Sequence, residues 1–148
     1  FTALVNEFTK FRVPKNWVPY SSSVTEWIDG FPVIDQFELS GQSYKVLESR
    51  GGHTPGQVFF LSYDSGLIFT GDYLLFVDSL SPWEREILNL PKFMMTSTNV
   101  DSELFRREME MMKKLIVNFD AFLRKSDQKA TIVPGHGDYY SHDRFLQD

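Results

Sequence analysis

The chain has 148 residues, with 15 Lys and Arg against 20 Asp and Glu, and a formal net charge of −5. A chain of about 150 residues can bury roughly 68–70% of its unfolded surface, so one core can form without disulfide bonds. The acidic balance and the lack of any basic run argue against a nucleic-acid binder or a protein held at an anionic membrane. No stretch approaches the roughly 20 apolar residues of a membrane span. Because the chain has no Cys, any metal site would rest on His, Asp and Glu.

Residues 1–32 form the least regular part, with aromatic side chains scattered around Pro14 and Pro19. Residues 1–11 are long enough for one short helix. We expect the aromatic side chains to pack on the rest of the domain, with a substrate-facing wall or an interface as the alternatives.

Short strands separated by turns follow from Val33 onwards. Residues 37–39 and 44–48 flank Ser40-Gly41-Gln42, and the alternation in the second segment predicts a hairpin with one solvated face. Residues 58–61, 67–70 and 130–133 are apolar without alternation. Continuous apolar runs are typical of strands that are covered on both faces.

A long connection and a long helix separate the last two of these strands. Residues 73–98 contain Pro82 and Pro91, and a connection of this length is usually functional or contains short helices. A helix is predicted from a cap at Asn99 or Asp101 to about Lys125. Its apolar positions recur at spacings of three and four and are Phe105, Met109, Met112, Ile116, Phe119 and Leu123. The cluster of Met109, Met111 and Met112 is interpreted as gap-filling core rather than a ligand-binding patch.

Three segments place glycine next to a possible metal ligand where a strand ends. They are Gly51-Gly52-His53-Thr54-Pro55-Gly56, Gly71-Asp72 and Pro134-Gly135-His136-Gly137. Two chain reversals give the strands before His53 and Asp72 the same direction, and the long helix can serve as a crossover to a parallel strand before His136. Ligands bind outside the carboxyl ends of such strands, so His53, Asp72 and His136 are predicted to converge.

Imidazole nitrogens and a carboxylate suit Zn, Fe or Mn, and a carboxylate can bridge two ions. Taken singly, each histidine is equally typical of an ordinary turn, and Asp72 after a glycine is more typical of a turn or a cap, so only their matched placement favours a metal site. Asp138, Tyr139 and Tyr140 follow closely enough to line the same mouth. His142 is interpreted as a plain surface histidine.

These motifs resemble those of the metallo-β-lactamase superfamily, which includes the glyoxalase II group. The matching segments are Gly52-His53-Thr54-Pro55-Gly56, Leu67-Ile68-Phe69-Thr70-Gly71-Asp72 and Ile132-Val133-Pro134-Gly135-His136-Gly137. The resemblance covers about residues 33–140. It implies an α/β fold, namely the C-terminal half of an αββα sandwich, with a mixed sheet and covering helices. Residues 1–148 would then be a single partial domain. By the same resemblance, His53 would bind the first metal, Asp72 would bridge both, and His136 would bind the second.

The family's first motif, His-x-His-x-Asp-His, is absent from this sequence, which has only three histidines. The resemblance places that motif upstream of Phe1. Since catalytic zinc ordinarily keeps three protein ligands and a water, we expect weak or no metal binding by this chain alone. The absent half would also leave apolar strands exposed, so a homodimer or exchanged dimer through the sheet is a further expectation.

The sequence is therefore interpreted as a fragment of a dinuclear metal-dependent hydrolase that acts on a small-molecule substrate through a metal-activated water. The expected cofactors are two divalent ions, with zinc favoured and Fe or Mn as alternatives. Two other classes stay open: a di-iron domain that reduces oxygen or nitric oxide, and a non-catalytic binding or assembly domain. Thioesters, lactones, lactams and phosphodiesters all suit the pattern, so it does not choose a substrate.

Overall fold

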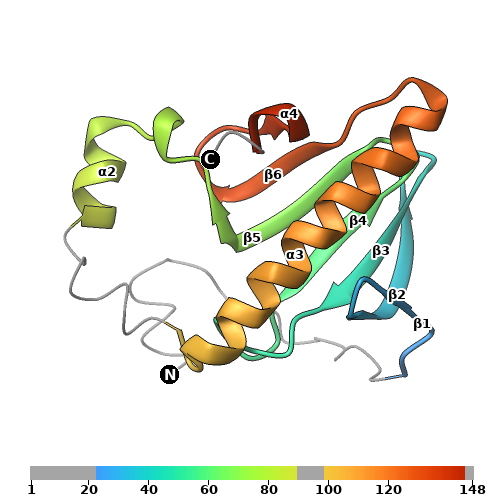
Figure 1. Cartoon of the computed structure of the whole chain (residues 1–148), viewed down its shortest axis with the longest axis horizontal. Coiled ribbons are helices and arrows are strands. Elements are labelled where there is room, and N and C mark those ends of the chain that lie inside the picture. Colours follow the sequence, from blue (N-terminus) through green and yellow to red (C-terminus); the bar gives the residue numbers. More distant parts are fainter. Residues whose placement is uncertain (1–22, 90–98, 146–148) are drawn as a thin grey trace.

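The computed structural model describes residues 23–89 and 99–145, which form one mixed sheet with helices (Figure 1). The seven strands lie in sequence order across the sheet. They are β1 (Glu26–Ile28), β2 (Phe31–Leu39), β3 (Gln42–Glu48), β4 (Val58–Ser62), β5 (Leu67–Leu75), β6 (Thr131–His136) and β7 (Tyr140–Ser141). The helical elements are η1 (Val77–Ser79), α2 (Pro82–Asn89), α3 (Ser102–Leu123), η2 (Arg124–Ser126) and α4 (His142–Phe145). The helix suggested for residues 1–11 lies outside the described residues.

Every neighbouring pair of strands is antiparallel except β5 and β6, which are parallel. The chain between them passes through α2 and α3, so the predicted crossover is confirmed. The short helices η1 and α2 lie inside the long connection that the sequence left unassigned. This topology carries the carboxyl ends of β3, β5 and β6 to the same edge of the sheet.

The predicted hairpin is formed by β2 and β3, with Leu39 paired to Gln42. Its two turn residues, Ser40 and Gly41, have φ angles of 54° and 77°. Two consecutive positive φ values fit the turn that matches the right-handed twist of the flanking strands.

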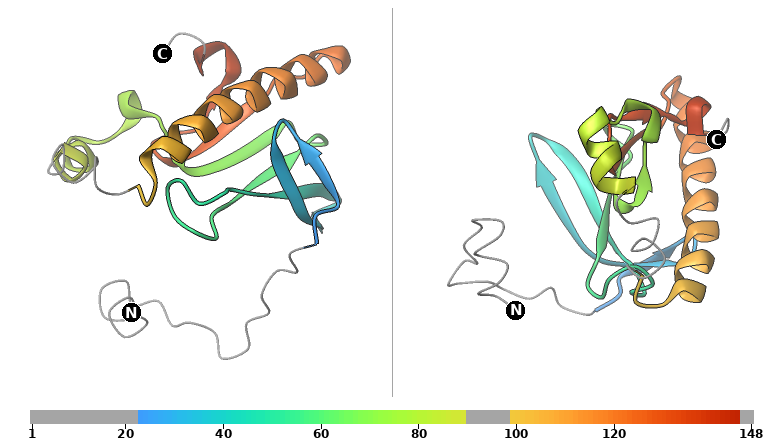
Figure 2. Two further views of the ribbon diagram at one scale, coloured as in Figure 1. Left: turned by 60° about the horizontal axis from the view of Figure 1, so that its bottom comes forward. Right: turned by 90° about the vertical axis from the view of Figure 1, so that its left-hand side faces the viewer.

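Helix α3 confirms the predicted long helix and crosses one face of the sheet (Figures 1 and 2). Asp101 caps it, because its carboxylate accepts hydrogen bonds from the backbone N–H groups of Glu103 and Leu104 at 3.0 and 2.9 Å. The residues that α3 buries are Glu108, Met112, Leu115, Ile116, Phe119, Asp120 and Leu123. Burying one large apolar side chain stabilises a fold by about 1.5–3 kcal/mol, so this stripe anchors the helix to the sheet.

The core lies between α3 and the sheet face that it covers. Phe31, Phe59, Ile68 and Ile132 have no exposed surface, and the rings of Phe31 and Phe59 meet edge to face at 5.2 Å. Edge-to-face contacts of this kind add to the stabilisation from burial.

The opposite face of the sheet differs from the prediction that the apolar strands are covered on both sides. Helices α3 and α4 both lie on one side (Figure 2), and no described element covers the other. Five side chains of this face line a hollow of about 250 Å³: Phe37, Leu39, Tyr44, Phe60 and Phe69. We call these five residues the open face. Apolar runs alone could not show this, because they do not reveal whether a second layer is present.

His142 is buried rather than on the surface, which corrects the sequence interpretation. Helix α4 packs its imidazole inward until Nδ1 lies 3.0 Å from Asp120 Oδ2, without hydrogen-bond alignment. The Asp120 carboxylate also accepts hydrogen bonds from Arg124 Nε and from the backbone N–H of Ala130. The burial results from packing of α4 against α3 and was not readable from local sequence.

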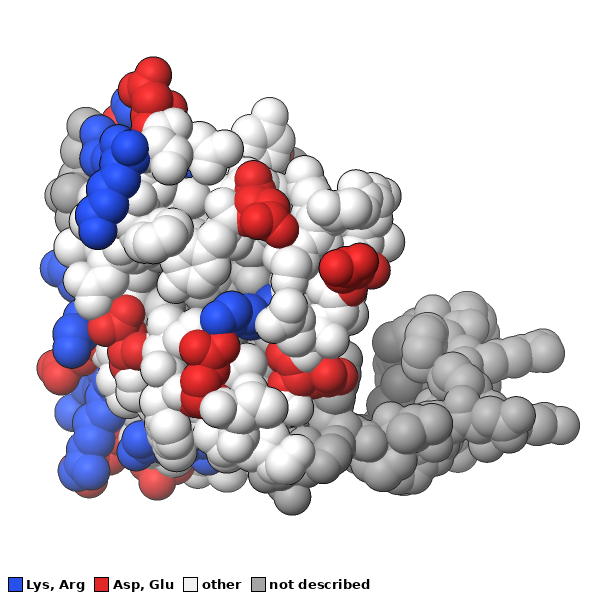
Figure 3. All heavy atoms as spheres, turned by 90° about the vertical axis from the view of Figure 1, so that its right-hand side faces the viewer, with Lys and Arg blue, Asp and Glu red and all other residues white. Residues whose placement is uncertain are grey.

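On the side of the molecule that faces the viewer in Figure 3, most of the surface is uncharged, and Lys and Arg gather along one edge among Asp and Glu side chains. None of the described helices is long and apolar enough to cross a membrane.

Candidate metal site

The structure brings together the three side chains that the sequence predicted to meet. His53 Nε2 lies 3.7 Å from Asp72 Oδ2, and His136 Nε2 lies 3.6 Å from Asp72 Oδ1. The two histidines therefore approach different oxygens of one carboxylate. Both distances exceed those of a direct hydrogen bond.

The parallel pairing of β5 and β6 places Asp72 next to His136. Gly71 is the register partner of Pro134, and Leu75 is the partner of His136. The expectation that Asp72 follows the end of a strand was wrong, because β5 continues past it to Leu75. The register shifts on both sides of this segment, and Gly71 has a φ of 52°. Such irregularities re-aim a side chain without ending a strand, and they leave no pattern of apolar residues that predicts them.

Gly135 leaves the space that the Asp72 carboxylate occupies. A Cβ atom on residue 135 would collide with Asp72 Oδ1 and with the backbone of Gly71 and Asp72. The glycine before His136 is thus required by the close approach of the two strands rather than by a positive φ.

Asn99 orients the ring of His53, whose Nδ1 lies 2.8 Å from Asn99 Oδ1. An amide oxygen only accepts, so Nδ1 donates this hydrogen bond, and Nε2 is the ring nitrogen that faces Asp72. Metal-binding histidines commonly have such a partner on their second nitrogen. The sequence had suggested Asn99 only as a helix cap, a position that Asp101 occupies instead.

The loop that carries His53 is also tied to the start of α3 through its backbone. The N–H of Val100 donates to the carbonyl of His53 at 3.1 Å, and the N–H of Asp101 donates to Gly52 at 3.0 Å. The His53 ring lies 6.0 Å from Phe105 and 6.2 Å from Tyr73 between ring centres. The loop is therefore held by elements that lie far from it in the sequence.

The three side chains differ in exposure. The side chain of His53 is 16% exposed, whereas those of Asp72 and His136 are 52% and 46% exposed. The site thus opens to solvent on the His136 side. Tyr140, which was expected near this mouth, is buried and packs on Phe76 at 4.8 Å between ring centres.

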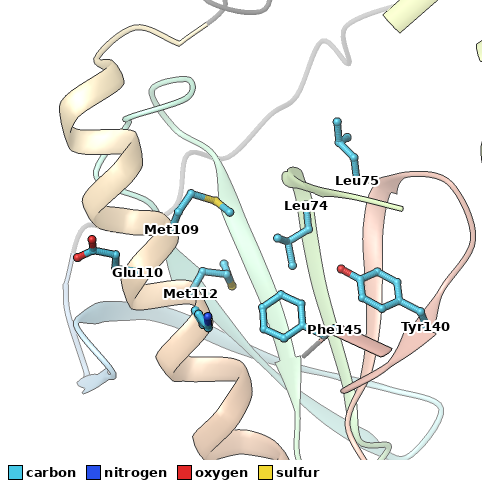
Figure 4. A pocket seen from close by; sticks show the side chains of 8 residues that line it. Leu74, Leu75, Met109, Glu110, Met112, Tyr140 and Phe145 are labelled. Carbon is cyan, nitrogen blue, oxygen red and sulfur yellow. The ribbon is translucent and has the colours of Figure 1, made fainter. Parts of the chain in front are cut away.

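An apolar cavity of about 360 Å³ is lined by residues of α3, β5, β7 and α4 (Figure 4). Its lining residues are Leu74, Leu75, Met109, Glu110, Met112, Lys113, Tyr140 and Phe145. Met112 is fully buried and Met109 partly so, so the methionines both pack in the core and border this cavity. Leu75 connects the two regions, because it is the strand partner of His136.

The donor set fits two metal positions, each incompletely. Two atoms that each lie about 2.0–2.2 Å from one tetrahedral ion are roughly 3.3–3.6 Å apart. The two His–Asp distances of 3.7 and 3.6 Å are close to this range. Each position has one imidazole nitrogen and one carboxylate oxygen, and the described residues hold no group of three or more His, Cys, Asp or Glu that could bind one ion.

Sequence reasoning missed Glu108, a fully buried carboxylate behind the His53 loop. Its position held a signal, because it lies three residues after Phe105 and four before Met112, on the apolar face of the predicted helix. A charged residue on such a face is unusual unless it has partners.

Comparisons of this chain with protein-family models, with curated proteins and with solved structures find no match.

Proposed function

We propose that this chain contributes one side of the dinuclear centre of a metal-dependent hydrolase of the metallo-β-lactamase type, as the C-terminal half of its αββα sandwich. The observation that carries the proposal is the Asp72 carboxylate, which presents one oxygen to His53 and the other to His136. A plain salt bridge would need only one of these histidines, whereas a carboxylate between two imidazoles is the arrangement that bridges two ions.

In this proposal His53 and Asp72 hold one ion, and His136 and Asp72 hold the other. The ions are zinc, with iron or manganese as alternatives, and when bound they supply acidification of a water and polarisation of a carbonyl or phosphoryl group. Asn99 fixes the proton of His53 on Nδ1 and so keeps Nε2 available. The exposed side of the site, near His136, admits the small-molecule substrate.

The remaining ligands come from outside residues 1–148 in this proposal, on a segment that carries the His-x-His-x-Asp-His pattern. Two protein ligands per ion fall short of the three that catalytic zinc ordinarily keeps. We therefore expect chain 1–148 alone to bind metal weakly and to have no hydrolase activity.

The first test compares chain 1–148 with the protein extended by the segment encoded upstream of Phe1. The extended protein should bind two equivalents of metal by elemental analysis and hydrolyse at least one member of a panel of thioesters, lactones, lactams and phosphodiesters. Asp72→Asn should lower metal content and reduce hydrolysis by about 100-fold or more, because it removes a ligand from both positions. Asp127→Asn, at an exposed carboxylate on a turn away from the site, serves as the control.

A reading frame without the His-x-His-x-Asp-His pattern would contradict the proposal, and so would an extended protein that has this pattern and no bound metal. Bound iron together with oxidase activity would show that the protein is a di-iron domain that reduces oxygen or nitric oxide rather than a hydrolase. An extended protein that binds a partner but neither metal nor substrate would show the non-catalytic class.

A further inference from the structure

Glu108 of α3 holds the loop that carries His53 from behind. Its Oε1 accepts the backbone N–H of Arg50 at 2.6 Å, and its Oε2 accepts that of Gly52 at 2.9 Å. Oε2 also accepts the hydroxyl of Tyr73 at 2.7 Å. Because the carboxylate has no exposed surface, these three donors replace its hydration.

Tyr73 extends this network to His53 itself. The backbone N–H of His53 donates to the Tyr73 oxygen at 3.4 Å, and the Ser49 hydroxyl lies 2.7 Å from the same oxygen. The Tyr73 hydroxyl donates to Glu108 Oε2, so the phenol links the buried carboxylate to the His53 backbone. Tyr73 directly follows Asp72, so one hydrogen-bond chain connects the strand of the bridging carboxylate to the loop of the first histidine.

Glu108 fills the space that a side chain at residue 52 would need. A Cβ atom on residue 52 would lie 2.6 Å from Glu108 Oε2 and 2.5 Å from the backbone nitrogen of Phe105. The loop can therefore rest directly on the carboxylate and on the first turns of α3. An apolar residue at 108 would leave the N–H groups of Arg50 and Gly52 without these acceptors and would destabilise the loop.

We propose that Glu108, acting with Tyr73, is a positioning residue that sets the His53 imidazole for metal binding; this inference rests on the proposed function. The backbone of His53 is held at its N–H by Tyr73 and at its carbonyl by Val100, and Asn99 holds its ring. Loss of the Glu108 carboxylate releases the loop from behind. The imidazole of His53 is then held less rigidly, while the position of His136, on β6, does not change.

The test follows the two histidine rings separately by NMR in chain 1–148 during titration with Zn²⁺ alone. Glu108→Gln should weaken the Zn²⁺ response of the His53 ring by about tenfold, as is typical for groups that support a metal ligand, with a smaller effect at His136. Tyr73→Phe should weaken the His53 response in the same direction by a smaller factor. Glu110→Gln, an exposed position on the same helix, should leave both responses as in the wild type.

A readout without metal accompanies the titration. Glu108→Gln should speed hydrogen exchange at the amides of Arg50 and Gly52 and broaden the Nδ1–H signal of His53. Thermal unfolding identifies a variant that fails to fold. If Glu108→Gln does not fold, the response of Tyr73→Phe to Zn²⁺ tests the inference instead, because this variant keeps the ring and removes only the hydroxyl.

Two outcomes overturn the inference in distinguishable ways. In the first outcome, both rings of the wild type respond to Zn²⁺, and neither Glu108→Gln nor Tyr73→Phe changes these responses. Glu108 then only stabilises the loop, and the proposed function survives. A wild-type chain whose rings do not respond to Zn²⁺, even when the upstream segment is added, removes the metal site and this inference with it.

Discussion

At the scale of single residues, the site depends on two glycines whose lack of a Cβ atom lets other groups approach closely. Asp72 can face both histidines because Gly135 has no Cβ, and the His53 loop can rest on Glu108 because Gly52 has none. Neither glycine is needed for a positive φ, since the backbone at both positions lies outside that region. Steric fit therefore explains these two glycines, and their substitution should disturb side chains that lie far from them in the sequence.

Gly135→Ala tests this steric requirement. The new methyl carbon would lie 2.3 Å from Asp72 Oδ1, far inside van der Waals contact. We expect a loss of about 1–3 kcal/mol in the free energy of unfolding, the usual cost of overpacking, measured by urea denaturation. The ring signals of His53 and His136 should both shift, because both face the displaced carboxylate.

Gly56→Ala is the matched control for this substitution. Residue 56 has a φ of 79°, and a Cβ there meets no atom within 4 Å. It should cost about 1–2 kcal/mol through backbone strain alone and leave the ring of His136 unchanged. Unchanged ring signals in Gly135→Ala would show that the carboxylate does not depend on this glycine.

At the scale of elements, Asp120 connects three of them. It lies on α3, accepts the N–H of Ala130 just before β6, and faces His142 of α4. Burial raises the pKa of Asp120. The hydrogen bonds from Arg124 and Ala130 and the charge of His142 lower it by a larger amount, so the net pKa lies below the usual 3.8. The folded state thus favours the carboxylate. This stabilisation is present above about pH 3.8 and is lost as the pH falls through the lower folded pKa.

Asp120→Asn should therefore destabilise the protein at pH 7 by about 1–3 kcal/mol, because charged hydrogen bonds are lost. The difference from wild type should shrink as the pH falls below about 3.8, because the unfolded wild-type chain takes up a proton at Asp120 there, whereas the folded state keeps the carboxylate to a lower pH. Urea denaturation over a pH series measures both values. Asp127→Asn, on an exposed turn, is the control. An equal destabilisation at pH 3 and pH 7 would show that the charge of Asp120 plays no part.

Strands β2 to β6, the hairpin and α3 were predictable because each depends on local chemistry, namely period-two alternation or a continuous apolar run, a Gly-containing turn and an apolar stripe with an Asp cap. Strands β1 and β7 were not predicted. The convergence of His53, Asp72 and His136 followed from strand direction alone. The continuation of β5 past Asp72 was not predictable, since it depends on pairing with β6. The burial of His142 and the role of Asn99 depend on contacts between distant segments. Glu108 was missed although its spacing from Phe105 and Met112 placed it on the buried face of the predicted helix.

At the scale of the whole molecule, the sheet has two unlike faces. One packs on α3, and the other presents the open face, where Phe37 stacks on Tyr44 at 5.3 Å and meets Phe60 edge to face at 5.7 Å. Leu39 is 60% exposed at its border. Exposed apolar patches of this kind promote association. In the proposed αββα sandwich this is the face that the other half covers.

We therefore expect chain 1–148 to associate with itself through the open face, and Leu39→Glu to weaken that association. At about 100 μM, sedimentation should show dimers for the wild type and a dissociation constant at least about tenfold higher for Leu39→Glu, since two buried charges oppose pairing. Val117→Glu, at an exposed position on α3, should dimerise as the wild type does. A monomeric wild type at this concentration would contradict the expectation. The extended protein should be monomeric in the same experiment, because its added half occupies the face on which the second copy would bind.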